Sequence, residues 1–377
     1  MKKIFRNIHL YLSLAAGIFI MIACLTGSIM VFEEEINHIF HSERYFVKVQ
    51  KERLPLNTLV KNAELSKKGF EVSGIKAYQQ SDRSTEISLS EINNGEPEKK
   101  EGRGKPSYTV YVNPYNGKIL NIENKRESFF KKVEMIHRFL LSKKEGVGHY
   151  IMSYSASFFL FILITGIVLW WPKSNKVLKQ RLKIKWDGNT KRLIHDLHVV
   201  VGFYTSVFLI IIVMTGLTMS FNWINNGIFT LTNSKKENPK PPKSNYLEGS
   251  SVIDFTGLEN IIINNFQDFN FYSIRVPKEK DDVFSLNILE NSQTENNFST
   301  FYIDQYKGTV INNLAFADKS LGQKIRSYVK PIHTGEIYGL TTKIINFIIC
   351  LLTLTFPITG VLMWLKRLKK KKLAVKI

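Results

Sequence analysis

Four stretches without a charged residue constrain this chain more than any other feature of its sequence. Residues 8–32, 147–171, 197–221 and 344–365 contain no Asp, Glu, Lys or Arg, and each stretch is 22 to 25 residues long. A helix needs about 20 predominantly apolar residues to cross the hydrocarbon core of a bilayer. Each stretch therefore predicts a membrane-spanning helix, and the pattern argues against a purely soluble protein.

The positive charge of the chain is concentrated outside these stretches. The net charge is +20, and 18 of the 52 basic residues, with a single acid, fall in segments 1–7, 172–192 and 366–377. All three segments lie on one side of a membrane if the four stretches cross it. This is the positive-inside pattern, which predicts cytoplasmic termini. Because it accounts for the charge, we do not expect nucleic acid to be a partner, whereas membrane lipid is one.

We expect an α-helical membrane protein, with a four-helix transmembrane bundle and two outward-facing α+β domains. Each outward domain predicts a short helix (56–66 and 255–266), a strand (85–90 and 283–288) and a closing hairpin with Asn or Asp and Gly in its turn (108–120 and 301–311). In chain order the expected segments are span 8–32, outward domain 33–146, span 147–171, cytoplasmic loop 172–192, span 193–221, outward domain 222–343, span 344–365 and cytoplasmic tail 366–377.

The sequence contains an internal repeat, in which a unit of span, outward domain and span occurs twice. A Thr-Gly pair recurs in every span. Small residues let membrane helices or a flat cofactor approach closely, and Thr can hydrogen-bond back to its own helix. Any one pair is explained by simple packing, but its presence in all four spans favours a shared role. The pairs are Thr26-Gly27, Thr165-Gly166, Thr215-Gly216 and Thr359-Gly360.

The repeat also selects four of the eight histidines. His9 lies 17 residues before Thr26, and His198 lies 17 residues before Thr215. Two more histidines precede the threonines of the returning spans by 28 and 26 residues. Ionisable residues in membrane segments are costly and by default indicate function. The selected set is His9 with His198 on the cytoplasmic side and His137 with His333 on the outer side, with His195 and His149 as alternates.

Paired histidines on facing helices of a bundle can bind haem iron from both sides. Two such pairs at opposite faces of the membrane would form an electron path, so we expect two haem b groups with their iron held by the selected histidines. Zinc is the rival metal. Structural zinc usually takes four ligands, and the cytoplasmic side offers only His9, His195, His198 and Asp196.

The depth of the outer pair is left open by the sequence. If the returning spans ran straight, His137 and His333 would lie about 18–21 Å beyond the hydrocarbon core. The glycines at 146 and 148, and those at 335 and 339, could break each helix and fold the preceding segment back. The alternative is that His149 is the ligand on the second span.

At these motifs the chain resembles PepSY-associated transmembrane proteins, also called iron-regulated membrane proteins, over nearly its whole length. The hairpins resemble the endings of PepSY modules. The other carriers are Ile8-His9, Ile136-His137-Arg138, Thr165-Gly166 through Trp171-Pro172, Asp196-Leu197-His198 and Ile332-His333-Thr334-Gly335.

The resemblance implies a reductase of the bacterial inner membrane that uses two haems to reduce ferric siderophores or other ferric chelates in the periplasm. Since only eleven residues follow Lys366, we expect no fused flavin domain, and a quinol or a separate cytoplasmic reductase as the electron donor. The alternative is a non-enzymatic PepSY sensor, scaffold or protease-modulating protein, which predicts no cofactor. A transporter is disfavoured because the spans offer no charged coupling site.

Overall fold

The computed structural model describes residues 2–92, 106–235, 241–291 and 297–374. The chain divides into two compact units. The helical unit comprises residues 1–33, 132–227 and 329–377, and the sheet unit comprises residues 34–131 and 228–328.

Four helices of the helical unit are long and apolar enough to cross a membrane, which confirms the four spans as helices. Three of them extend into basic flanks, because Lys and Arg form helices well and their long side chains reach polar surroundings. The exception, α6, ends just before Pro172, where the helical conformation is disfavoured. The spans are α1 (Lys2–Met30), α6 (Val147–Trp170), the continuous run of α8 (Thr190–Asp196), η1 (Leu197–Val201) and α9 (Gly202–Ser220), and α13 (Leu340–Ala374). Residues 375–377 of the expected tail lie outside the described residues.

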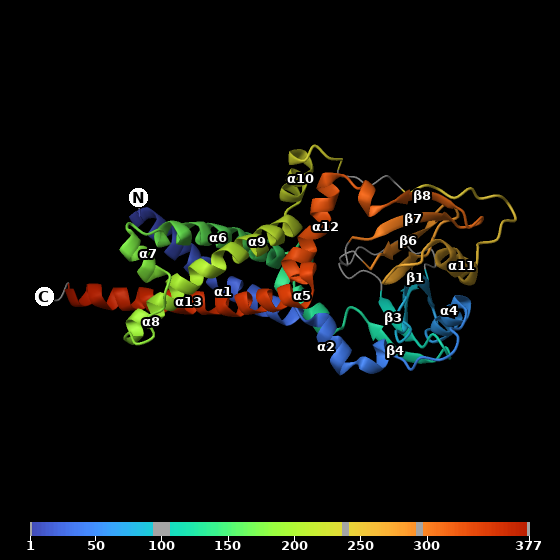
Figure 1. Cartoon of the computed structure of the whole chain (residues 1–377), viewed down its shortest axis with the longest axis horizontal. Helices are drawn as coiled ribbons and strands as arrows, with labels where there is room; N and C mark the ends of the chain where they lie inside the picture. The colour runs from blue at the N-terminus through green and yellow to red at the C-terminus, as the bar shows by residue number, and fades with distance from the viewer. Residues whose placement is uncertain (1, 93–105, 236–240, 292–296, 375–377) are drawn as a thin grey trace. The chain divides into compact units, whose positions relative to one another are not determined.

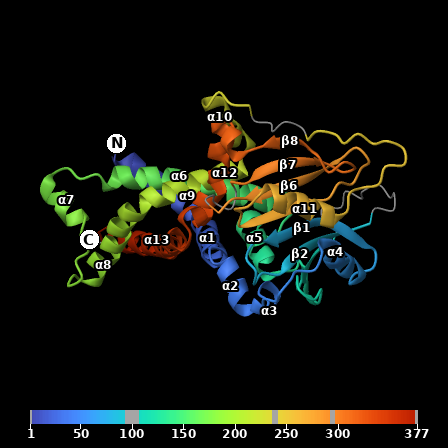
Figure 2. The same cartoon turned by 45° about the vertical axis from the view of Figure 1, so that its right-hand side comes forward.

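These helices form a four-membered bundle in which α1 and α9 each contact both α6 and α13 (Figures 1 and 2). Gly17 of α1 allows a close approach, since a Cβ there would lie 3.5 Å from Pro357 of α13. The middle of the bundle is an apolar core contributed by all four helices. Its buried residues are Ala16, Ile20, Cys24, Phe159, Ile162, Leu163, Leu209, Val213, Leu217, Ile349 and Cys350.

Two helices that precede the returning spans fold back against the bundle. α5 (Phe129–Phe139) joins α6 through Leu140 and Leu141, which both have positive φ angles. A Cβ on Gly148 would lie 1.9 Å from the Phe139 carbonyl oxygen, so only glycine permits this turn. α12 (Leu321–Thr334) reaches α13 through Gly335 and Gly339, which flank η3 (Glu336–Tyr338) with positive φ angles.

The strands of the two segments that we expected to face outward form one antiparallel sheet. The strand order is β4-β3-β2-β1-β5-β6-β7-β8, and β1 pairs directly with β5. The two expected α+β modules therefore share a single sheet. The physical reason is that this pairing removes two exposed strand edges, whose free backbone groups would otherwise invite aggregation. The strands are β1 (Phe70–Tyr78), β2 (Thr85–Glu91), β3 (Ser107–Val112), β4 (Ile119–Asn124), β5 (Phe271–Arg275), β6 (Val283–Leu289), β7 (Ser299–Asp304) and β8 (Val310–Leu314).

The two halves of this sheet repeat each other in detail. Each half begins with a helix, α4 (Leu56–Leu65) or α11 (Phe255–Asn265), as the sequence predicts. Leu59 and Leu258 belong to one hydrophobic core beneath both helices. The hairpin turns also match, because Asn113 and Asp304 each accept a hydrogen bond from the amide two residues later.

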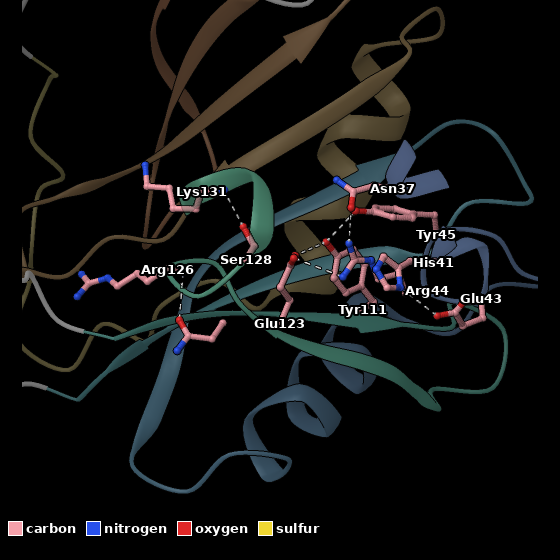
Figure 3. Close-up of polar contacts among 11 residues, drawn as sticks. Asn37, His41, Glu43, Arg44, Tyr45, Tyr111, Glu123, Arg126, Ser128 and Lys131 are labelled. Atoms are coloured by element: carbon pink, nitrogen blue, oxygen red, sulfur yellow. Dashed lines mark hydrogen bonds and ion pairs between the residues drawn. The ribbon is translucent and has the colours of Figure 1, made fainter. Parts of the chain in front are cut away.

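A buried arginine fastens the segment that follows α1 to the sheet (Figure 3). Arg44 lies in α3 (Ser42–Tyr45), which follows α2 (Glu33–Phe40), and it is 5% exposed. Its guanidinium lies 3.4 Å from the Glu123 carboxylate and donates a 3.1 Å hydrogen bond to Asn37 Oδ1. The Tyr111 hydroxyl donates to the same Glu123 carboxylate at 3.0 Å. We interpret this cluster as structural, since its charges are paired. The remaining short helices are α7 (Asn175–Arg181), α10 (Asn222–Leu231) and η2 (Phe316–Asp318).

Candidate functional site: two crossed histidine pairs

Two histidines face each other near the N-terminal end of α1. His9 lies in α1 and His198 lies in η1, and their ring centroids are 6.3 Å apart with an angle of 78° between the planes. The η1 segment is a single π-helical turn inside an otherwise α-helical span. Such turns are rare and occur frequently at functional sites, where they redirect a side chain.

A second histidine pair lies toward the opposite end of the bundle. The rings of His137 in α5 and His333 in α12 also have centroids 6.3 Å apart, with planes crossed at 69°. Burial, together with the neighbouring His333 ring, lowers the pKa of His137 to about 4. Burial also lowers the pKa of His333. Both imidazoles are therefore neutral near pH 7, and the neutral imidazole is the form that binds metals.

The spacing of both pairs suits a metal ion bound between the rings. A metal–imidazole bond is about 2.0–2.1 Å long and a ring nitrogen lies about 1.1 Å from the ring centroid, so two imidazoles on one ion have centroids about 6 Å apart. Within the described parts of the chain, no three His, Cys, Asp or Glu side chains are grouped to hold a metal ion. Two protein ligands are too few for structural zinc, but they suffice for haem, whose macrocycle supplies four nitrogens.

Each of the four histidines is held by the threonine of a Thr-Gly pair on a different helix. His9 Nδ1 lies 3.1 Å from Thr165 Oγ1, and His198 Nδ1 lies 2.9 Å from Thr359 Oγ1. His137 and His333 make the equivalent contacts with Thr26 and Thr215, at 2.9 and 3.1 Å respectively. Because Nδ1 is occupied in every ring, Nε2 is the nitrogen left for another ligand.

The glycine of each pair makes room for the same imidazole. A Cβ on Gly216 would lie 3.0 Å from Cε1 of His333, and one on Gly166 would lie 3.4 Å from Cε1 of His9. The corresponding distances are 3.6 Å from Gly27 to His137 and 3.5 Å from Gly360 to His198. The Thr-Gly pairs therefore pack against histidines of other helices, and the spacing of 17 residues along one span, from His9 to Thr26 or from His198 to Thr215, does not reveal these contacts.

The alternates lie elsewhere. The His149 ring contacts the rings of Phe139 and Tyr150 and is not brought to His333. His195 is half exposed, and its Nδ1 lies 3.2 Å from Oδ1 of the buried Asp196. The fold-back of α5 thus brings His137, which precedes the expected span, into the bundle, and the geometry favours the four histidines selected by the repeat.

Comparison with known protein families identifies the family to which the chain belongs. The family model for the PepSY-associated TM region matches residues 6–367. The chain belongs to the PepSY-associated TM family. Together with the four apolar helices, this membership identifies it as a membrane protein. No curated protein matches this PepSY-associated chain.

Proposed function

We propose that this PepSY-associated protein is a two-haem oxidoreductase of the bacterial inner membrane. It passes electrons from the cytoplasmic side to a ferric chelate, such as a ferric siderophore, on the outer side. The observation that carries the proposal is the presence of two crossed histidine pairs near opposite ends of one bundle, each pair with a centroid separation of 6.3 Å.

The residues present fit haem b at both positions. His9 and His198 would hold one iron, and His137 and His333 would hold the other. A buried donor next to the first pair supports this fit. Trp170, one helical turn beyond Gly166, has an indole Nε1 that is buried without a hydrogen-bond partner among the described residues. A haem propionate is an acceptor of the kind that such an orphaned N–H requires.

The separation of the two pairs suits transfer across a bilayer. His9 and Thr26, which contacts His137, are 17 residues apart on the single helix α1, which corresponds to about 25 Å along its axis. The hydrocarbon core is about 30 Å thick, so one pair would lie near each face. Apolar side chains such as Ile20, Leu209 and Val213 fill the interval and exclude water.

The distribution of charge supports an orientation. Three basic stretches lie at the end of the helical unit that carries the His9–His198 pair. They are the start of α1 with Lys2, Lys3 and Arg6, the basic helix α7, and the basic end of α13. By the positive-inside rule this end faces the cytoplasm. Electrons would therefore enter near His9 and His198, from a quinol or a separate reductase, and leave near His137 and His333.

When bound, haem supplies reversible one-electron chemistry, which amino-acid side chains lack. The chain's own contribution is to hold two ligands per iron, to orient them through the Thr-Gly pairs and to keep the interval dry. One electron converts Fe(III) in the chelate to Fe(II), which hard oxygen donors bind less tightly because of its lower charge. Reduction would thereby favour release of the iron.

The proposal is tested by following electrons out of the reduced protein. Detergent-purified protein is reduced anaerobically, freed of reductant and mixed with a ferric siderophore and an Fe(II)-specific dye. We expect the reduced haem band to disappear as Fe(II) appears, one Fe(II) per electron. The His333→Ala variant, which retains the His9–His198 pair, should transfer electrons at least about tenfold more slowly. Reduced haem that persists in the presence of the chelate would refute the reductase. Colourless protein from haem-supplied cells would favour the PepSY sensor or scaffold.

A further inference from the structure

We propose that the four Thr-Gly pairs are positioning elements that fix the tautomer and the ring plane of each histidine, and thereby tune the two irons that the proposed function places between them. This inference rests on that function, but its structural part concerns the polypeptide alone. It extends the role of the spans from supplying histidines to controlling their electronic state.

A backbone carbonyl determines where the imidazole proton lies. His9 Nδ1 is 3.0 Å from the Ile162 carbonyl oxygen, three residues before Thr165. His137 and His333 are equally placed, at 3.1 Å from the Ala23 carbonyl and 2.9 Å from the Ile212 carbonyl. A carbonyl can only accept a hydrogen bond, so Nδ1 must carry the proton in these rings. Nε2 then presents its lone pair.

The hydrogen bonds of the threonine hydroxyl also require the imidazole proton to lie on Nδ1. Thr359 donates its own proton to the Thr355 carbonyl at 2.8 Å, one turn earlier in α13. Its oxygen can therefore only accept from His198 Nδ1, which also hydrogen-bonds to the Phe356 backbone. The other three threonines donate to the carbonyl four residues before them in the same way, at 2.6 to 2.9 Å. All four rings thus carry the proton on Nδ1.

The glycine explains why the imidazole can reach that carbonyl. In a regular helix the carbonyl of Ala23 accepts from the amide of Gly27, four residues later. A Cβ on Gly27 would already be in van der Waals contact with the ring, 3.6 Å from Cε1 of His137, so a larger side chain would have to compete with the imidazole for this space. Threonine thus supplies the acceptor, and glycine leaves space for the ring beside it.

The crossed ring planes follow from the helices that carry the threonines. His9 is held by α6 and His198 by α13, so the two rings of one pair are oriented by different helices and cross at 78°. The second pair is held by α1 and α9 and crosses at 69°. Hydrogen bonding to the outer nitrogen of a ligating histidine fixes its orientation and raises its basicity. A more basic ligand favours Fe(III) over Fe(II).

The test compares Thr359→Val, which removes the acceptor but keeps the shape, with Thr359→Ser, which restores the hydroxyl. Thr353→Val is the matched control, because Thr353 is a buried threonine of the same helix whose hydroxyl donates to the Ile349 carbonyl. In Thr359→Val we expect haem to be retained and one midpoint potential to rise. The expected change in the reduction equilibrium is about tenfold, which equals about 59 mV for a one-electron couple. Thr359→Ser and Thr353→Val should match the wild type.

Two spectroscopic readouts separate this inference from the proposed function. In the loaded protein, crossed ligand planes predict a strongly anisotropic low-spin ferric electron paramagnetic resonance signal, which Thr359→Val should alter for one haem alone. In haem-free protein, nitrogen-15 shifts of the imidazoles should report Nδ1–H for His9, His137, His198 and His333. Unchanged potentials and spectra in Thr359→Val, or Nε2–H tautomers, would overturn the positioning role. Wild-type protein that binds no haem would overturn the proposed function, while the tautomers would still test the hydrogen bonds.

Discussion

At the scale of single residues, each Thr-Gly pair contacts its histidine in two ways: the threonine hydroxyl hydrogen-bonds to the ring, and the glycine leaves room for it. Gly216 is the tightest of the four glycines, because a Cβ there would lie 3.0 Å from His333. Gly202 lies on the same helix, and a Cβ there would meet no heavy atom within 4 Å. The two glycines of α9 therefore differ in their contacts, Gly216 lying inside the helix and Gly202 at its first residue.

This difference predicts opposite outcomes for the same substitution. Gly216→Ala should shift the His333 ring by a few tenths of an ångström, since the new Cβ would lie 3.0 Å from its Cε1, and should lower the haem content from about two toward about one per chain, because His333 is one of the two residues that would hold that haem. Gly202→Ala should keep the wild-type haem content and gain a little helix stability, since Gly costs about 1 kcal/mol relative to Ala within a helix. Pyridine haemochrome assays of both variants provide the measurement. Equal haem content in the two would contradict the packing account.

The pairing of His9 with His198 and of His137 with His333 could be predicted from the sequence, but their contacts with the threonines could not. Equal spacing of His9 and His198 from the next Thr-Gly pair identified them as equivalent residues. The partner of each histidine, however, lies on a different helix. His9 and Thr165, for example, are separated by 156 positions in the chain. Spacing along one helix does not determine which neighbouring helix faces it.

At the scale of elements, the fold-back of α5 decides which histidine reaches the second pair. The sequence left His137 and His149 as alternatives because it predicts glycine breaks but not the direction of the chain after them. The positive φ angles of Leu140 and Leu141 and the contact of Gly148 with Phe139 turn α5 back onto the bundle. His137 therefore packs against α1 although it lies ten residues before Val147, where α6 begins.

The tight contact at Gly148 gives an element-scale prediction. Gly148→Ala would place a Cβ 1.9 Å from the Phe139 carbonyl oxygen, so the turn must open and His137 must move. We expect loss of the haem between His137 and His333 and retention of the other. Gly227→Ala is the control, since a Cβ there meets no heavy atom within 4 Å. Haem content and midpoint potentials distinguish the two variants, and retention of both haems in Gly148→Ala would argue against the fold-back.

The sheet unit offers a stability prediction at the same scale. Arg44→Ala removes one partner of a buried ion pair with Glu123, which should cost about 2–3 kcal/mol because the Glu123 carboxylate is partly exposed to water. For a unit of this size that corresponds to a melting temperature about 5–10 °C lower. Arg126→Ala, which removes an exposed arginine nearby in Figure 3, should change it by less than about 2 °C. Thermal unfolding of the full chain measures the melting temperature of both variants. Equal changes in melting temperature would contradict the structural role of Arg44.

At the scale of the whole molecule, the chain is a duplicated unit whose two copies complete each other. Each candidate metal site takes one histidine from each half, and the eight-stranded sheet joins four strands from each half through β1 and β5. The local elements of both halves could be predicted from hydropathy and turn residues. The joining of the two halves into one sheet could not, because alternation along a strand does not specify its neighbour.

Haem stoichiometry tests most directly whether the two histidine pairs each bind one haem. Reduced-minus-oxidised absorbance and pyridine haemochrome assays should give about two haem b groups per wild-type chain. His198→Ala and His333→Ala should each retain about one, and the double variant should retain none. Folded wild-type protein without haem, or single variants that keep both haems, would contradict the assignment of one haem to each pair.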